Sequence, residues 1–134
     1  MSAELDNLTP FIVSGQKYAK DIAFRLVNEV MPSLVNDDFK PCKDLIFDVR
    51  YSMGSNQNCA FYYHNILEIA EKLHYLKDDP EIEFMSLATV GPAFFMITKK
   101  PEKAERIFQE LQMTTYRAKV YNNKYHVLNR QALI

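Results

Sequence analysis

Glycine is scarce in this chain, because the 134 residues include only three: Gly15, Gly54 and Gly91. Loops that wrap backbone N–H groups around a nucleotide phosphate usually carry two or three glycines close together. The three glycines of this chain stand far apart in the sequence. The chain therefore has no glycine-rich nucleotide loop of its own.

Cysteine is also scarce, since the sequence contains only Cys42 and Cys59. No apolar secretion segment accompanies them, so we expect reduced thiols in a cytoplasmic protein and no metal site. His64 and His74 are ten positions apart on one predicted helix. At about 100° per residue they face different directions, so we expect no metal or catalytic histidine pair.

The chain has no large excess of either charge, because 16 lysines and arginines stand against 17 acidic residues. Proteins that bind nucleic acid usually carry a basic surface, so we expect no nucleic-acid partner. No apolar run approaches the about 20 residues needed to span a bilayer, and we expect no membrane contact. Apolar residues make up 48% of the chain, which is ordinary for one soluble domain over residues 1–134.

The stretch Glu81–Thr98 is the segment around which we expect the fold to be organised. One set of residues alternates with another over 81–88, namely Ile82, Phe84, Ser86 and Ala88 with Glu81, Glu83, Met85 and Leu87. Aromatic and β-branched residues crowd the second half of the stretch. Between these runs, Gly91 provides backbone freedom, and Pro92 fixes its own φ and lacks a donor. The pattern predicts strands at 81–88 and 93–99, with a sharp bend at 88–92.

This bend has two interpretations. In the first, Gly91 and Pro92 only satisfy the geometry of a hairpin connection. In the second, its small residues bring backbone N–H groups close to a phosphate or carboxylate. One glycine is weak support for the second interpretation, and the residues alone leave both open.

Helical periodicity dominates the rest of the chain. Asp38 suits the N-cap of one helix, Gly54 its end, and Pro101 the first turn of another. The acidic pairs Asp37-Asp38 and Asp78-Asp79 are therefore assigned to caps and turns. Residues 1–14 lack a period and predict an extended lead-in. Apolar residues at three- and four-residue steps predict helices at 15–34, 39–53, 60–77 and 101–112.

Two further strands complete the predicted fold. Tyr116, Ala118 and Val120 alternate with polar residues, which predicts a strand at 114–121, followed by a last strand at 125–129. We expect an α+β fold, a two-layer arrangement of a mainly antiparallel sheet with helices on one face. The order of elements suits a ferredoxin-like (split βαβ) variant that lacks its first strand. The open sheet edge predicts a homodimer.

Several segments of the chain resemble the C-terminal domain of GHMP-superfamily kinases. They are Pro32–Phe39, the helix end at Gly54, and Leu87–Thr98 (L-A-T-V-G-P-A-F-F-M-I-T) with P-E-K-A-E shortly after it. Within that superfamily the chain is most similar to the archaeal branch that includes beta-ribofuranosylaminobenzene 5′-phosphate synthase. The similarity covers residues 21–121, and its most specific part is the Gly-Pro loop.

The resemblance implies a substrate-side domain of a small-molecule kinase or phosphoribosyl transferase. It places a phosphorylated small molecule at Ser86, Thr89, Gly91 and Pro92. Gly91 and Pro92 match the family pattern, whereas Ser86 replaces its first loop glycine, Thr89 one of its paired serines, and Asn56 its lysine.

The superfamily's ATP-binding half has no counterpart in this sequence. The resemblance therefore implies a separate or missing N-terminal nucleotide-binding domain as partner. It implies no cofactor in this chain, with Mg-ATP bound only by that half, and a chain that is inactive alone. The departures at Ser86 and Asn56 favour an alternative, a non-catalytic binding or assembly module that retains the fold.

Overall fold

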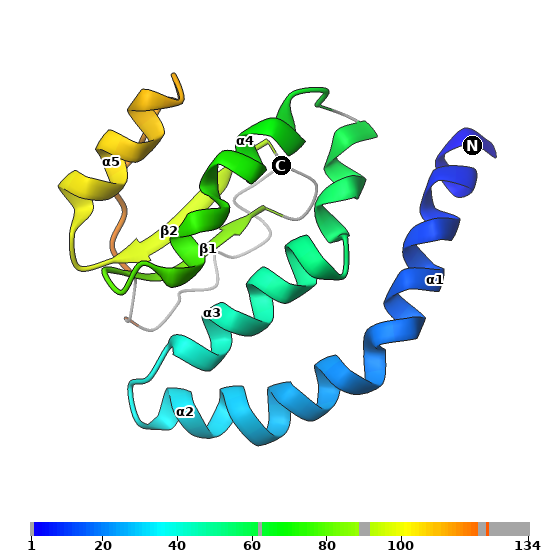
Figure 1. Ribbon diagram of the computed structural model, residues 1–134, viewed down its shortest axis with the longest axis horizontal. Coiled ribbons are helices and arrows are strands. Elements are labelled where there is room, and N and C mark those ends of the chain that lie inside the picture. Colours follow the sequence, from blue (N-terminus) through cyan, green and yellow to red (C-terminus); the bar gives the residue numbers. More distant parts are fainter. Residues whose placement is uncertain (1, 62, 89–91, 121–122, 124–134) are drawn as a thin grey trace, which may run out of the picture.

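The computed structural model describes residues 2–61, 63–88, 92–120 and 123. These residues form an α+β structure (Figure 1) in which η1 and η2 are π-helical and η3 and η4 are 3₁₀ turns. The elements are, in order, α1 (Ser2–Arg25), η1 (Leu26–Val30), α2 (Met31–Val35), α3 (Lys40–Phe47), η2 (Asp48–Ser52), η3 (Ser55–Phe61), α4 (Ile66–Leu73), η4 (His74–Asp78), β1 (Ile82–Leu87), β2 (Phe94–Thr98) and α5 (Pro101–Glu110).

The two strands β1 and β2 form an antiparallel pair, which confirms the strand pair predicted on either side of the bend. Leu87 lies opposite Phe94 at the end of the pair. Beyond them, the N–H of Ala88 donates to the carbonyl oxygen of Ala93 at 2.7 Å and closes the hairpin. The predicted bend thus connects two adjacent strands.

An irregularity in β1 changes which side chains share a face. The register shifts between Ile82 and Phe84, and a bulge of this kind reverses the alternation that follows it. Ile82, Met85 and Leu87 are all buried. Phe84, which simple alternation would place beside Ile82, stacks on Phe95 with ring centroids 5.4 Å apart. The sequence alternation therefore predicted the strand but not its buried face.

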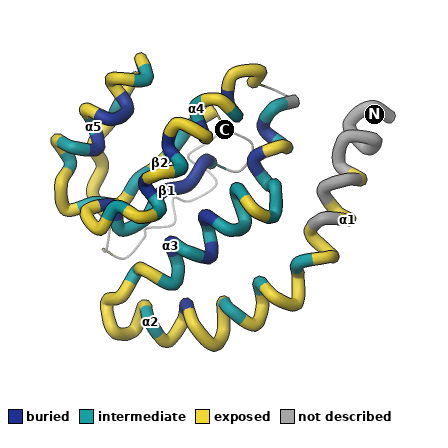
Figure 2. The backbone as a smooth tube through the Cα atoms, in the orientation of Figure 1, coloured by how far each residue is buried: buried dark blue, intermediate teal, exposed yellow. Residues whose placement is uncertain are grey.

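Three helices complete the core with the hairpin. Phe47 of α3, Leu73 of α4 and Phe108 of α5 meet Ile82 and Met85 in one apolar cluster. Figure 2 shows the buried positions gathered where these elements meet. Each large apolar side chain buried in this way contributes about 1.5–3 kcal/mol, so this cluster holds the helices on the hairpin.

The predicted helices are confirmed in position more than in length. Within the predicted helix at 39–53, residues 40–52 form α3 and η2. Gly54 follows them with a φ of 82°, a value that favours glycine. The third helix is shorter than predicted, because the 3₁₀ turn η3 extends to Phe61 and α4 begins only after its N-cap Asn65. Pro101 opens α5 at its predicted place.

The N-terminal segment is helical, so the prediction of an extended lead-in over residues 1–14 is wrong for residues 2–14. Ala3, Glu4 and Leu5 are good helix formers, and acidic residues favour the beginning of a helix. Pro10 suggested a break because proline usually interrupts a helix interior. Together α1, η1 and α2 form one bent helical arm (Figure 1). Its η1–α2 part runs beside α3, and its α1 part leads away from the rest of the molecule.

One buried side chain and one carboxylate attach this arm. Among the described side chains of the arm, Val30 alone is buried, with 2% of its surface exposed. Arg25 Nη1 donates to Asp48 Oδ2 at 2.9 Å, and Lys77 Nζ donates to Asp48 Oδ1 at 3.0 Å. Asp48 therefore connects the arm, η2 and η4.

The predicted strand at 114–121 is wrong, because residues 114–120 form no strand. Tyr116 and Val120 are 90% and 80% exposed, so the described residues do not bury the face predicted to be buried. Arg117 instead forms ion pairs with Glu102 and Glu105, which hold this segment beside α5. The strand predicted at 125–129 lies outside the described residues, whose sheet has two strands.

The first prediction concerns Asp48. Burial raises its pKa, but hydrogen bonds from Lys77 and Arg25 outweigh this effect and hold the pKa below its ordinary value. Such a carboxylate stabilises the fold above its unfolded pKa of about 3.9, and this contribution disappears as the pH falls through the folded pKa. Asp48→Asn should lower the free energy of unfolding by about 1–3 kcal/mol at neutral pH, and by less at about pH 3.

Urea unfolding followed by circular dichroism at both pH values measures this difference. Asp44→Asn is the matched control, because Asp44 pairs at 2.6 Å with the exposed Lys40. Exposed pairs contribute about 0–1 kcal/mol, so this variant should change stability little. Equal losses in the two variants, or a loss for Asp48→Asn that does not depend on pH, would contradict the role of Asp48.

Candidate functional site

The structure describes two of the four residues predicted to contact a phosphate. Thr89 and Gly91 lie outside the described residues. Pro92 is exposed at the end of the connection between β1 and β2. Ser86 lies in β1, before the connection, with 5% of its surface exposed. Of the two described residues, Pro92 thus lies on the surface and Ser86 lies in the interior.

Ser86 belongs to a small network that fixes the end of β1. Its Oγ accepts a hydrogen bond from Arg50 Nε at 3.2 Å and donates to the carbonyl oxygen of Leu87 at 3.0 Å. Arg50 Nη2 donates to the same carbonyl at 2.7 Å. Ser86 and Arg50 therefore support the residues from which the β1–β2 connection begins.

Arg50 is the functional candidate that the sequence reasoning missed. Burial lowers the pKa of its guanidinium. A third hydrogen bond runs from Arg50 Nη1 to Ser55 Oγ at 3.5 Å. All three acceptors are therefore neutral oxygens, two of hydroxyl groups and one of a carbonyl group. No carboxylate of the described residues forms an ion pair with it. Arg50 is half-buried, and a partly desolvated charge without a carboxylate partner favours an anionic partner.

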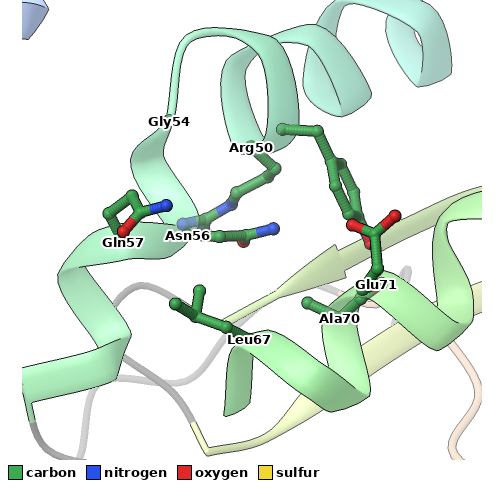
Figure 3. Close-up of a pocket in the computed structure, with 8 residues that line it drawn as sticks. Arg50, Gly54, Asn56, Gln57, Leu67, Ala70 and Glu71 are labelled. Carbon is green, nitrogen blue, oxygen red and sulfur yellow. The ribbon is translucent and has the colours of Figure 1, made fainter.

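A pocket of about 140 Å³ opens beside Arg50 (Figure 3). It lies where η2 and η3 face α4. The η2–η3 side contributes Arg50, Asn56 and Gln57, and α4 contributes Leu67, Ala70 and Glu71. In Figure 3 the side chains of Arg50 and Asn56 lie close together on one side of this space, and Glu71 lies on another. A guanidinium, an amide and a carboxylate therefore line one small pocket.

Asn56 contributes an unsatisfied acceptor to this pocket. It is 7% exposed, and its Oδ1 is buried without a hydrogen-bond partner among the described residues. Buried polar atoms are usually paired, and leaving one unpaired costs about 1–3 kcal/mol. The Tyr51 hydroxyl is already used, because it donates to the carbonyl oxygen of Ala70 at 2.6 Å. Burial raises the pKa of Tyr51 to about 12, so it stays a donor.

A second cavity of about 390 Å³ has several of its polar groups paired within the fold. It lies between residues 37–43 and 77–83. Asp38 and Asp79 accept hydrogen bonds from the backbone N–H groups of Lys40 and Glu81, as expected for caps and turns. The buried Lys43 donates to the carbonyl oxygen of Asp79 at 2.7 Å. These contacts are structural.

The two histidines His64 and His74 lie in different surroundings. His74 stacks on Tyr51 at 4.3 Å between ring centroids, and His64 is exposed. In the part of the chain that the structure describes, no group of three or more histidine, cysteine or acidic residues is placed to hold a metal ion. Among the described helices, none is both long enough and apolar enough to cross a membrane.

We compared the chain with protein-family models, with curated proteins and with solved structures, and nothing matches it in any of the three comparisons.

Proposed function

We propose that this chain is the substrate-side domain of a two-part enzyme that acts on a phosphorylated small molecule. The resemblance to GHMP-type enzymes suggests a kinase or a phosphoribosyl transferase whose nucleotide-binding domain is a separate or missing N-terminal part. We also propose a ferredoxin-like arrangement of the fold. The alternative is a non-catalytic binding or assembly module, in which the chain has kept the fold and lost the chemistry.

The observation that carries this proposal is the position of Arg50 at the base of the β1–β2 connection. The guanidinium bonds Ser86 and Leu87, immediately before the segment 88–92 where the resemblance implies a phosphate. Its charge has no carboxylate partner among the described residues, so it creates a positive potential beside that segment. A phosphate bound there would interact with this positive charge, and no ion pair among the described residues would have to break.

The second prediction concerns nucleotide binding. The sequence has no glycine-rich loop, and the proposed nucleotide-binding part is a different domain. Isothermal titration of the isolated chain with Mg-ATP should therefore show no appreciable binding, and no turnover of added substrates. Micromolar binding of Mg-ATP would refute the division of the enzyme into two parts.

The third prediction concerns the connection itself. Thr89→Val keeps the β-branched shape while it removes the hydroxyl, so the free energy of unfolding should change little. If Thr89 contacts phosphate, binding should weaken by about 0.5–1.5 kcal/mol for a neutral hydrogen bond, and by up to about 3 kcal/mol for one to a charged phosphate. Titration with inorganic phosphate and with ribose 5-phosphate measures this change.

Gly91→Ala is the matched structural variant. If Gly91 has a positive φ, this substitution should lower the free energy of unfolding by on the order of 1 kcal/mol. If the connection is only a turn, Gly91→Ala destabilises the chain and Thr89→Val leaves phosphate affinity unaltered. That result would return residues 88–92 to a purely structural role.

A second candidate function is assembly, and an exposed apolar stripe on the arm favours it. Phe24, Val27, Met31 and Val35 follow one another at three- and four-residue steps, and between 57% and 85% of each residue is exposed. Apolar residues clustered on a surface in this way usually mark an interaction site. The stripe therefore needs a covering partner, which we propose to be a second copy of this chain. A dimer contact through this stripe would be isologous, as most dimer interfaces are.

The fourth prediction tests this dimer against the one predicted through the open sheet edge. Sedimentation velocity should show a dimer for the wild type and a monomer for Val27→Glu, which places a charge in the stripe. Phe95→Glu is the control, because Phe95 is 48% exposed on the hairpin, away from the arm. A dimer disrupted only by Phe95→Glu would favour the sheet, and a wild-type monomer would refute both.

A further inference from the structure

Arg50 has unused hydrogen-bond donors beside the pocket between η2, η3 and α4. A guanidinium has five N–H donors, and each of its two terminal nitrogens carries two of them. The hydrogen bonds to Ser86, Ser55 and Leu87 use one N–H on each of the three nitrogens. One N–H on Nη1 and one on Nη2 therefore have no acceptor among the described residues.

The fold holds this guanidinium beside the pocket. Nε and Nη2 bond the end of β1 at 3.2 and 2.7 Å. Arg50 belongs to the π-helical segment η2, and π-helical turns are rare and frequently occur at functional sites. In Figure 3 its side chain reaches from η2 toward Asn56 and the facing helix α4. The two unused donors are therefore held next to the open space of the pocket.

The charges on the pocket lining favour an anion over a cation. Arg50 and Glu71 are the two charged residues among the described lining, and no ion pair joins them. Arg50 is half-buried, whereas Glu71 is exposed. Water screens an exposed charge more strongly than a partly buried one, so the positive charge dominates inside the pocket.

The pocket has room for a small polyatomic ion. Its volume of about 140 Å³ equals the share of about five liquid water molecules. A planar carboxylate or a tetrahedral phosphate group fits this space beside the guanidinium.

We propose that this pocket is a binding site for a small oxyanion, two oxygens of which accept hydrogen bonds from Nη1–H and Nη2–H of Arg50. Arginine commonly binds carboxylate and phosphate groups through a pair of N–H groups in this way. The site goes beyond the proposed function, which places a phosphate at residues 88–92. Of that connection, neither Ala88 nor Pro92 lines the pocket.

Heteronuclear NMR of the full chain tests the site with sodium acetate and sodium phosphate as probes, at an ionic strength kept constant with sodium chloride. We expect a saturable shift of the Arg50 Nε–H signal with at least one probe, at millimolar concentrations, as for one charged contact at a partly exposed site. Saturation by either probe supports the site, and the stronger probe shows whether it prefers a carboxylate or a phosphate group. Absence of saturation with both probes would overturn the proposal.

Two substitutions separate binding from the support that Arg50 gives to β1. Arg50→Lys keeps the charge but loses the paired donors, so affinity for the bound probe should fall by about tenfold. Glu71→Gln removes the opposing charge at an exposed position, so affinity should rise by about two- to fivefold. A purely structural role of Arg50 predicts no such gain.

Glu68→Gln is the matched control for Glu71→Gln. Glu68 lies on the same helix, pairs with Lys72 and does not line the pocket, so its substitution should leave the affinity unchanged. No gain in Glu71→Gln, or an equal gain in Glu68→Gln, would refute the assignment.

Thr89→Val distinguishes this site from the phosphate contact of the proposed function. Affinity that falls in Arg50→Lys and is kept in Thr89→Val supports binding in the pocket. Affinity that falls in Thr89→Val and is kept in Arg50→Lys would overturn this inference and leave the proposed function standing.

Discussion

The described structure depends on the apolar contact between the β1–β2 hairpin and the helices that cover it. A two-stranded hairpin is at best marginally stable in water, because it buries too little surface on its own. Phe47, Leu73 and Phe108 supply that surface from three helices. The bulge after Ile82 turns Ile82 and Met85 toward them together. A change in the β1 register would therefore turn these strand side chains away from helices that are far apart in the sequence and that meet in this cluster.

The same dependence explains why Arg50 is held so firmly. Its guanidinium spans from η2 to the last residue of β1, beside the apolar cluster that contains Leu87 and Cys59. A side chain fixed in this way has little rotamer freedom left to lose. One residue thus supports the end of β1 and carries a charge that no carboxylate of the described residues pairs.

Much of the fold could be predicted from the sequence, because local patterns dominate it. Apolar periodicity predicted α4 and α5, Gly54 the end of η2, and alternation the hairpin. Longer-range effects caused the errors. Residues 114–120 have the alternation of a strand, but Arg117 pairs with α5 and no strand partners them.

The candidate pocket was less predictable than the fold. Arg50 lies in a helical segment whose sequence indicated only an apolar stripe, so nothing local suggested that its charge would have no partner. Asn56 entered the sequence analysis only as a departure from a family lysine. Their proximity depends on the turn at Gly54, whose positive φ brings η3 back beside η2. Ser86 and Pro92 were candidates from the resemblance, and their contacts required coordinates.

The attachment of the arm has a consequence for the motions of the chain. Because Val30 is the one buried side chain described on the arm, opening the arm exposes little apolar surface compared with unfolding of the core. Local opening free energies follow the number of such contacts, so we expect the arm to open at a lower cost in free energy than the helix-covered hairpin. Backbone amides of α1 should then exchange with solvent through partial opening, and those of β1 more slowly.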